Sequence, residues 1–279
     1  MVNRWFGICS AALMVLANTA LVLRDMVPEW LAGNPPESAA LHLQPDQEFR
    51  QQNGIFNAAG TRIGTIWSVS SSSGTFVGVR SWALIEPLQL PPNITTPRMR
   101  ITTQVTYCLD GRVESLLMTV EGFGMLIRLN GNLHPPDMFP CEWQLGDRDG
   151  KFMLDAAETR ALGSVIRPFE SLAGLDVGQS WRVKLINPFT RLLPGFRGPD
   201  VSTSSVLVRV TAREWIEHST GRVEAFRVET NSVRAWVNDD GRVLRQEIEL
   251  PVFEKLRLED EPYDLEAARH GQRVELNEP

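Results

Sequence analysis

The stretch of residues 206–250 constrains the fold most strongly, because apolar residues alternate with mostly polar ones over four successive runs. In the second run, for example, Phe226 and Val228 alternate with Arg227 and Glu229. A period of two places one side of a strand on an apolar core and the other in water. Short turn sequences separate the runs, so we predict four antiparallel strands in a meander.

The last of these turns has a specific chemistry. The sequence Asn238-Asp239-Asp240-Gly241 is typical of a type I turn that is closed by a glycine with positive φ. Asp110-Gly111 is a second strong hairpin signal, and it predicts that residues 99–107 pair with residues 112–120.

The same alternation, broken by glycine and asparagine, extends over most of the remaining chain. It predicts a hairpin of residues 61–69 and 75–85, and further strands at residues 125–129, 141–145, 151–154 and 178–186. A short helix is expected at residues 155–166, where Asp155 can cap the first turn. The predicted fold class is therefore all-β, with one short helix in the soluble part.

The N-terminal segment, residues 1–24, carries a long apolar run. Arg4 precedes the uncharged residues 5–23, and a helix of that length spans about 28 Å, the thickness of a hydrocarbon core. A cleaved signal peptide or a buried helix would also fit, but apolar residues continue past the cleavage-like sequence at Ala17. We expect an uncleaved single-pass transmembrane anchor, with the bulk of the chain extracytoplasmic, in the periplasm.

The chain divides into four predicted segments. The anchor is followed by a proline-containing linker at residues 25–47, an antiparallel β domain at residues 48–258 and an acidic tail at residues 259–279. The tail is expected to be solvated. A long loop at residues 187–205 could cover a cavity as a lid or pack down as ordinary core, and ordinary core is favoured.

Two cysteines of the β domain, Cys108 and Cys141, leave two alternatives open. An oxidising compartment would allow a disulfide between them, and two separate thiols are the other outcome.

Few residues in the chain suit an active site. His134, Asp137 and Cys141 form the one group that combines different catalytic residue types. Such a sequence more often contains a loop histidine and a structural cysteine than a catalytic site. His218 is expected to be solvated beside a turn. We therefore expect no enzyme activity, no catalytic residues, no metal and no cofactor. The net charge of −6, with scattered basic residues, argues against binding nucleic acid.

Residues 171–258 resemble the β domains of uncharacterised bacterial envelope proteins, which also occur ahead of transglutaminase-like domains. The resemblance is carried by Leu172, Leu175, Val177, Gly178 and Trp181, by Val183, Val208, Val210, Glu214, Gly221, Val223 and Ala225, and by the segments 235–237 and 240–244. Those domains are similar to the open half-barrel of the lipoprotein-carrier proteins. The resemblance implies a curved antiparallel sheet, an open half-barrel with a helix in its concave side, and an envelope location.

Two functions fit these observations. The first is a non-enzymatic protein that binds or carries a lipophilic ligand in the concave face of the half-barrel. Its ligand-binding residues would be Trp67, Val183, Phe226, Ala235 and Ile248. The second is a structural or interaction subunit of an envelope assembly, with an envelope protein as partner and no small-molecule ligand. A cavity of about 300 Å³ or more would favour the first.

Overall fold

The computed structural model describes residues 33–273, with gaps. The described residues are 33, 36, 44–45, 47–87, 89–90, 94–122, 124–134, 138–154, 172–185, 204–250 and 254–273. The predicted anchor, the predicted helix at residues 155–166 and most of the loop at residues 187–205 lie outside them. Within the described part, no helix is long and apolar enough to cross a membrane.

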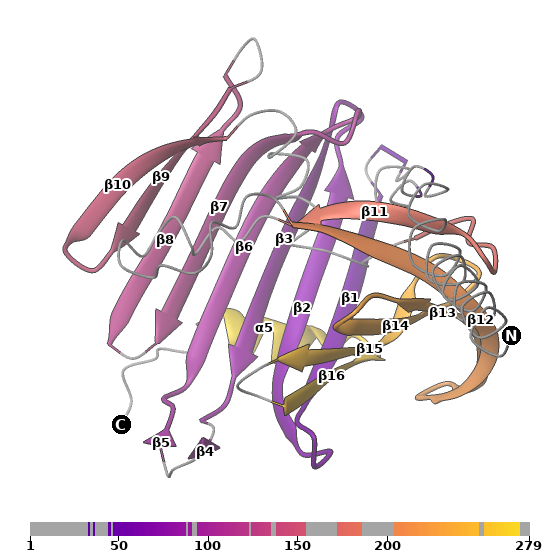
Figure 1. The fold of residues 1–279 in the computed structure, drawn as a ribbon. Helices are drawn as coiled ribbons and strands as arrows, with labels where there is room; N and C mark the ends of the chain where they lie inside the picture. Colours follow the sequence, from indigo (N-terminus) through magenta and orange to yellow (C-terminus); the bar gives the residue numbers. More distant parts are fainter. Residues whose placement is uncertain are drawn as a thin grey trace, which may run out of the picture.

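The architecture is one antiparallel sheet of 14 strands that curves without closing (Figure 1). Its spatial order is β10-β9-β8-β7-β6-β3-β2-β1-β16-β15-β14-β13-β12-β11. Strands β11 and β12 pass in front of the central strands in the view of Figure 1. The strands are β1 (Glu48–Phe56), β2 (Arg62–Ser72), β3 (Phe76–Ile85), β6 (Met99–Cys108), β7 (Val113–Gly122), β8 (Met125–Asn132), β9 (Phe139–Leu145), β10 (Arg148–Leu154), β11 (Ser180–Leu185), β12 (Ser204–His218), β13 (Gly221–Glu229), β14 (Val233–Val237), β15 (Val243–Leu250) and β16 (Glu254–Glu261).

The remaining described elements are small. Two-residue strands β4 (Gln89–Leu90) and β5 (Ile94–Thr95) pair with each other beside the main sheet. Helix α5 (Leu265–Arg273) follows β16. The all-β fold class, the open sheet and the presence of one short described helix agree with the sequence prediction, although that helix is not the predicted one.

The predicted meander is confirmed, because β12, β13, β14 and β15 pair in that order. Gly241 has a φ of 83°, and Gly111 in the turn between β6 and β7 has a φ of 79°. Both values lie in the left-handed region, which glycine adopts without a steric penalty.

The centre of the sheet differs from the prediction. Strand β1 pairs with β16, so that Gln52 lies opposite Glu261 and joins the two halves of the sheet. The predicted acidic tail at residues 259–279 is therefore corrected: residues 259–261 complete β16, and Leu265–Arg273 form α5. Strand β1 lacks an apolar alternation, and β16 has only a short one, at Leu256 and Leu258. Polar partners in the fold stabilise both strands.

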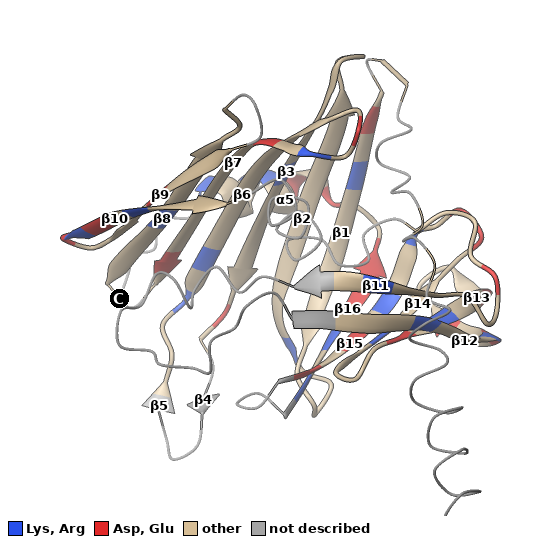
Figure 2. Ribbon diagram, turned by 45° about the horizontal axis from the view of Figure 1, so that its top comes forward, with Lys and Arg blue, Asp and Glu red and all other residues tan. Residues whose placement is uncertain are grey.

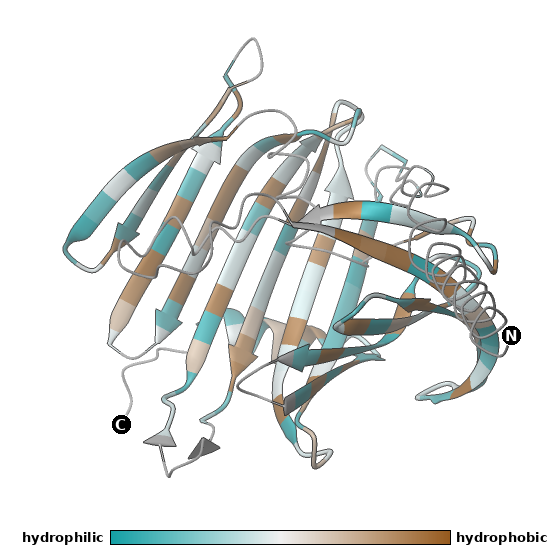
Figure 3. Ribbon diagram, in the orientation of Figure 1, coloured by the Kyte–Doolittle hydropathy of each residue, from teal (hydrophilic) through white to brown (hydrophobic). Residues whose placement is uncertain are grey.

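The two faces of the sheet follow from the register, because residues paired across antiparallel strands point to the same side. Gln52 pairs with Trp67 and Trp67 with Trp82, and we call their side the helix face because α5 packs on it. The other side, here the opposite face, carries Ser70 paired with Val79. Figure 3 shows hydrophobic and hydrophilic residues alternating along several strands.

Acidic and basic residues occur together on β12–β16 (Figure 2), and on the helix face they form ion pairs. Three of the carboxylates each lie between two basic side chains of their own or neighbouring strands, as Glu229 lies between Arg227 and Arg234. The pairs join Glu214 to Arg227, Glu247 to Arg234 and Lys255, Glu259 to Arg245 and Arg257, and Glu261 to Arg62. Opposite charges on neighbouring strands favour this strand pairing, which explains why such polar segments form a sheet.

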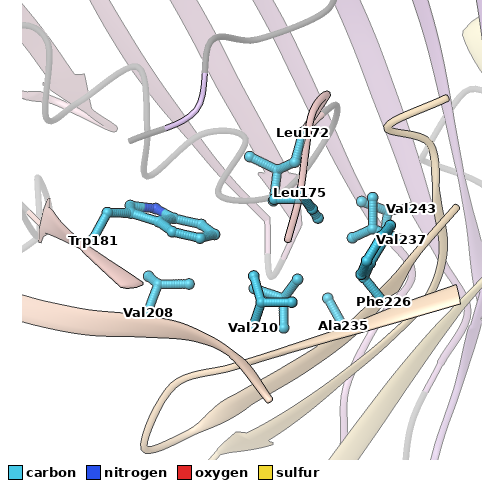
Figure 4. Packing of buried hydrophobic residues seen from close by; sticks show 10 residues of the cluster. Leu172, Leu175, Trp181, Val208, Val210, Phe226, Ala235, Val237 and Val243 are labelled. Atoms are coloured by element: carbon cyan, nitrogen blue, oxygen red, sulfur yellow. The ribbon is translucent and has the colours of Figure 1, made fainter. Parts of the chain in front are cut away.

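A hydrophobic core on the opposite face anchors the second half of the sheet. The segment 172–175 lays Leu172 and Leu175 over the apolar side chains of β12–β14 (Figure 4). The backbone N–H of Leu172 donates to the carbonyl of Gly241 at 2.8 Å, which ties this segment to the turn before β15. The core consists of Leu172, Leu175, Trp181, Val208, Val210, Phe226, Val228, Ala235, Val237 and Val243.

Helix α5 is attached to the helix face at its start and near its middle. At its start, the Asp264 carboxylate accepts from the backbone N–H groups of Glu266 and Ala267, which is an N-cap. The side-chain carbonyl of buried Gln52 accepts both the backbone N–H of Asp264 and the indole N–H of Trp67. Further along, the Trp82 indole N–H donates to the carbonyl of Ala268 at 3.1 Å. These contacts fix the helix beside the sheet.

Candidate functional site

A groove of about 420 Å³ lies between α5 and the helix face of β1, β2, β3 and β6. Its floor follows the cross-strand row of Val69, Arg80 and Gln104, which are direct neighbours in the register of β2, β3 and β6. Gly78, one step along β3 on the same face, adds no side chain to the floor. The groove therefore extends down to the backbone at that point.

The helical wall is one stripe of α5. Leu265, Ala268, Arg269 and Gln272 line the groove, and their spacing of three and four residues places them on one side of a helix. Trp82 lines the groove from the sheet, and its ring stacks on Trp67 with centroids 6.2 Å apart. The groove thus combines apolar and polar groups from both the helix and the sheet.

The charge of the groove differs from that of the chain. Arg50, Arg80 and Arg269 line it together with one acidic residue, Glu48, which gives a formal excess of two positive charges, against −6 for the whole chain. Arg50 is paired with Glu48 at 2.8 Å and lies over the Tyr263 ring. Arg80 and Arg269 are exposed, and neither forms an ion pair with another described residue.

The groove continues along α5 into a second hollow of about 320 Å³. Both hollows share Arg80, Trp82 and Gln272, and Arg100 and Thr102 line the second one. Arg100 forms an ion pair with Glu121 and donates to the carbonyl of Gln272, which holds the end of α5 against β6. Arg80 and Trp82 therefore stand at the junction of one extended groove.

A second cluster of polar groups surrounds the buried carboxylate of Asp260, whose side chain is 3% exposed. Arg242 donates to this carboxylate at 2.7 Å. The Nε2 atom of His218 lies 3.1 Å from the backbone carbonyl of Asp260, and its Nδ1 atom lies 2.9 Å from the Thr220 hydroxyl. The expectation that His218 is solvated is corrected, since its side chain is 9% exposed.

The Asp260 cluster connects strands that are not neighbours. His218 ends β12, whereas Asp260 belongs to β16, and three strands separate them in the sheet. Arg245 of β15 likewise donates to the carbonyl of Glu217 at 2.9 Å. These contacts hold the tip of the β12–β13 hairpin against β15 and β16. The cluster is therefore part of the curvature of the sheet, and it lines none of the groove beneath α5.

Burial gives Asp260 a measurable pH signature. Burial raises the pKa of its carboxyl above the ordinary value of 3.8, and Arg242, His218 and Gln51 oppose this only in part. Between the ordinary and the raised pKa the folded protein holds more protons than the unfolded chain, so stability falls as pH rises through that window. We expect the free energy of unfolding of the wild type, relative to Asp260→Asn, to decline as pH rises above about 4.

Urea denaturation of both proteins from about pH 3.5 to pH 6 measures this difference, because the asparagine cannot titrate. A difference that grows with pH would mean that Arg242 and His218 outweigh burial and that the pKa of Asp260 is lowered.

The structure separates the five predicted ligand-binding residues. Trp67 lies on the helix face, buried between Trp82 and α5. Ala235 lies on the opposite face, because it pairs with Gln246 and Gln246 pairs with Leu258, three residues before Glu261 in β16. Phe226 is packed with Ala235 in the core of Figure 4, with Val183 against it, and Ile248 lies opposite Val233 on β14.

Of the two alternatives for Cys108 and Cys141, the structure has two separate thiols and no disulfide between them. Cys108 ends β6 and Cys141 lies in β9, with β7 and β8 between them. Three inter-strand spacings are about 14 Å, far beyond the Cα separation that a disulfide allows. Burial, then Asp110 and Glu114, raise the pKa of the Cys108 thiol, which makes it a weaker nucleophile at neutral pH.

The group of His134, Asp137 and Cys141, considered above as a candidate active site, is not brought together in the described residues. His134 is exposed, Cys141 is fully buried beside the Phe139 carbonyl, and Asp137 lies outside the described part. Within the same part of the chain, no group of three or more histidine, cysteine or acidic residues could hold a metal ion.

The fold and the groove define an all-β protein with one open, curved sheet and a C-terminal helix on one face. No protein-family model matches the chain, and no curated protein matches its sequence. Among solved structures it is similar to a β-barrel-like protein of a domain of unknown function, DUF1849, from Brucella abortus. That match has a TM-score of 0.47 and 8% identity, and it covers 80% of this chain and 100% of that chain.

A second similar structure is that of a "putative exported protein with YmcC-like fold" from Bacteroides fragilis. Its TM-score is 0.24 at 8% identity, and the match covers 77% of this chain and 95% of that chain.

Proposed function

We propose that this protein is a non-enzymatic binding protein that takes a lipophilic small molecule into the groove beneath α5. The observation that carries the proposal is the groove itself, whose volume of about 420 Å³ lies within the range of ligand pockets. Its lining joins apolar side chains, among them Val69, Trp82 and Leu265, to a larger share of polar and charged groups than most ligand pockets carry, and these groups can orient a ligand.

The site differs from the one that the sequence predicts. Phe226 and Ala235 are 8% and 0% exposed in a core that Leu172 and Leu175 fill, so they present little surface to a ligand. The groove beneath α5 offers open space on the other face of the sheet. Export and membrane anchoring stay predictions that rest on residues 1–24.

Gly78→Leu is the sharpest test, because it fills the groove from its floor. A Cβ atom on Gly78 would meet the nearest atom, the Ser71 hydroxyl oxygen, at 3.7 Å, an ordinary contact that the fold tolerates. Leucine then projects into the space beside Arg80 and α5. We expect the wild-type chain to bind the neutral lipophilic dye Nile red with one-to-one stoichiometry, and Gly78→Leu to bind it about tenfold or more weakly.

The matched control is Gln144→Leu, which adds the same side chain to an exposed position of the helix face in β9, outside the groove. Circular dichroism and urea denaturation establish that each variant is folded. Equal dye binding by all three proteins would place the binding elsewhere. A wild-type chain that binds no dye and carries no co-purified lipophile in mass spectrometry would favour the structural or interaction subunit.

A further inference from the structure

We propose, on the basis of the proposed function, that the ligand of this groove is a single-chain amphiphile whose anionic head group is bound by Arg80 and Arg269. The head group would be a carboxylate or a phosphate, and the apolar chain would lie along Trp82 and the α5 stripe.

The positions of the two arginines carry this inference. Arg80 projects from β3 on the floor of the groove, and Arg269 from α5, which forms the helical wall of the same groove. An anion between them would contact a guanidinium group from each side. Guanidinium groups form paired, charge-assisted hydrogen bonds with carboxylates and phosphates, and this geometry favours them over neutral oxygens.

The charge balance of the surrounding surface supports the same inference. Most arginines of the helix face in β12–β16 lie against carboxylates, and Arg50 and Arg100 at the groove are also paired. Arg80 and Arg269 lie in the groove without a described carboxylate partner. Two cations that line one groove repel each other, and an anionic ligand would offset that repulsion.

Neighbouring groups add hydrogen-bond capacity. Gln104 pairs directly with Arg80 in the register of β3 and β6, and Gln272 lies one helical turn from Ala268 and Arg269 on the groove stripe. Their amides can donate to head-group oxygens. The apolar chain has Val69, Trp82 and Leu265 to pack against.

The inference separates an anionic amphiphile from a neutral lipophile and from a free anion. The test is displacement of Nile red from the full-length wild-type chain by four competitors: dodecanoate, dodecyl phosphate, dodecanol and inorganic phosphate. We expect the two anionic amphiphiles to displace the dye at concentrations about tenfold or more below dodecanol, with affinity that falls as salt is added. Inorganic phosphate should not displace it.

The double variant Arg80→Gln/Arg269→Gln identifies the residues. This variant should bind the anionic amphiphiles about tenfold or more weakly than the wild type, and its affinity for dodecanol should be unchanged. The control Arg128→Gln removes an exposed arginine from the same face in β8, outside the groove, and should change neither.

The outcomes distinguish this inference from the function on which it rests. If dodecanol competes as well as the anions and the double variant changes nothing, the head-group inference is overturned while the lipophile-binding function stands. If inorganic phosphate competes as well as dodecyl phosphate, the ligand is a free anion and the amphiphile is ruled out. If the dye does not bind, both proposals fail.

Discussion

Replacing Trp67 with alanine is expected to lower the free energy of unfolding by about 3–5 kcal/mol, the range for truncating a buried aromatic side chain. Trp67 is 4% exposed, stacks on Trp82 and donates its indole N–H to Gln52. The helix also rests on it, since a Cβ atom on Gly271 of α5 would come within 2.8 Å of the ring. The substitution therefore removes a ring stack, a hydrogen bond and the support of α5 together.

Trp215→Ala provides the matched control for Trp67. Trp215 is 56% exposed and contacts Arg222, so its loss is expected to cost about 1 kcal/mol or less. Urea denaturation followed by circular dichroism gives both values. A similar small effect for both tryptophans would show that α5 is not held by Trp67, and the groove that depends on α5 would lose its support.

Gly241→Ala is expected to destabilise the fold by about 2–5 kcal/mol, for two reasons that add. The φ of 83° is unfavourable for any residue with a Cβ atom. The Cβ atom would also come within 2.8–2.9 Å of the backbone of Leu172 and Ala173, and backbone cannot turn aside as a side chain can. The segment that covers the core of the second half of the sheet would have to shift.

Gly146→Ala separates the two contributions to the Gly241 effect. Gly146 has a φ of 57°, and an added Cβ atom there has no neighbour within 4 Å, so the conformational penalty of about 1–2 kcal/mol is expected alone. Chemical denaturation of the two variants measures the difference. Equal losses would show that segment 172–175 does not press on the turn.

Strands with an apolar face and glycine-containing turns were predictable from sequence, because residues that are adjacent in the chain specify each of them. The hairpin at Asp110-Gly111 and the meander through Gly241 are confirmed within a few residues. Their signals are local. A glycine with positive φ and a run such as Phe226-Arg227-Val228 specify their structure without help from distant parts of the chain.

Strands β1 and β16 could not be predicted in this way, because their partners are distant. The sequence of β1 offers Gln51 and Gln52 where a core would usually take apolar residues. Gln52 is satisfied by Trp67, Asp264 and Glu261, and the charged residues of β16 are satisfied by β15 and by Arg62. Hydrogen bonds and ion pairs that form only in the fold leave no periodic signal in the sequence.

The groove was missed for a related reason. Trp67 and Ala235 were predicted to share one concave face, whereas the register through β1, β16 and β15 places them on opposite faces. The face on which a residue lies depends on the register of every strand between it and the reference strand. When one strand is missing from the predicted strand order, the face of a distant residue cannot be assigned. Leu265, Ala268 and Arg269 were assigned to a tail, so their stripe could not be recognised as a wall.

The pairing of β1 with β16 has a consequence for how the chain reaches its native state. Other neighbours in the main sheet are close in sequence, so their hairpins can form early and independently. Gln52 and Glu261, by contrast, lie 209 residues apart, so β16 is synthesised long after β1. Until then β1 and β15 each present an unpaired edge, which is the kind of surface that attracts other strands. Folding should therefore end with one slow, entropically costly closure, and the nascent chain should be most prone to aggregation just before it.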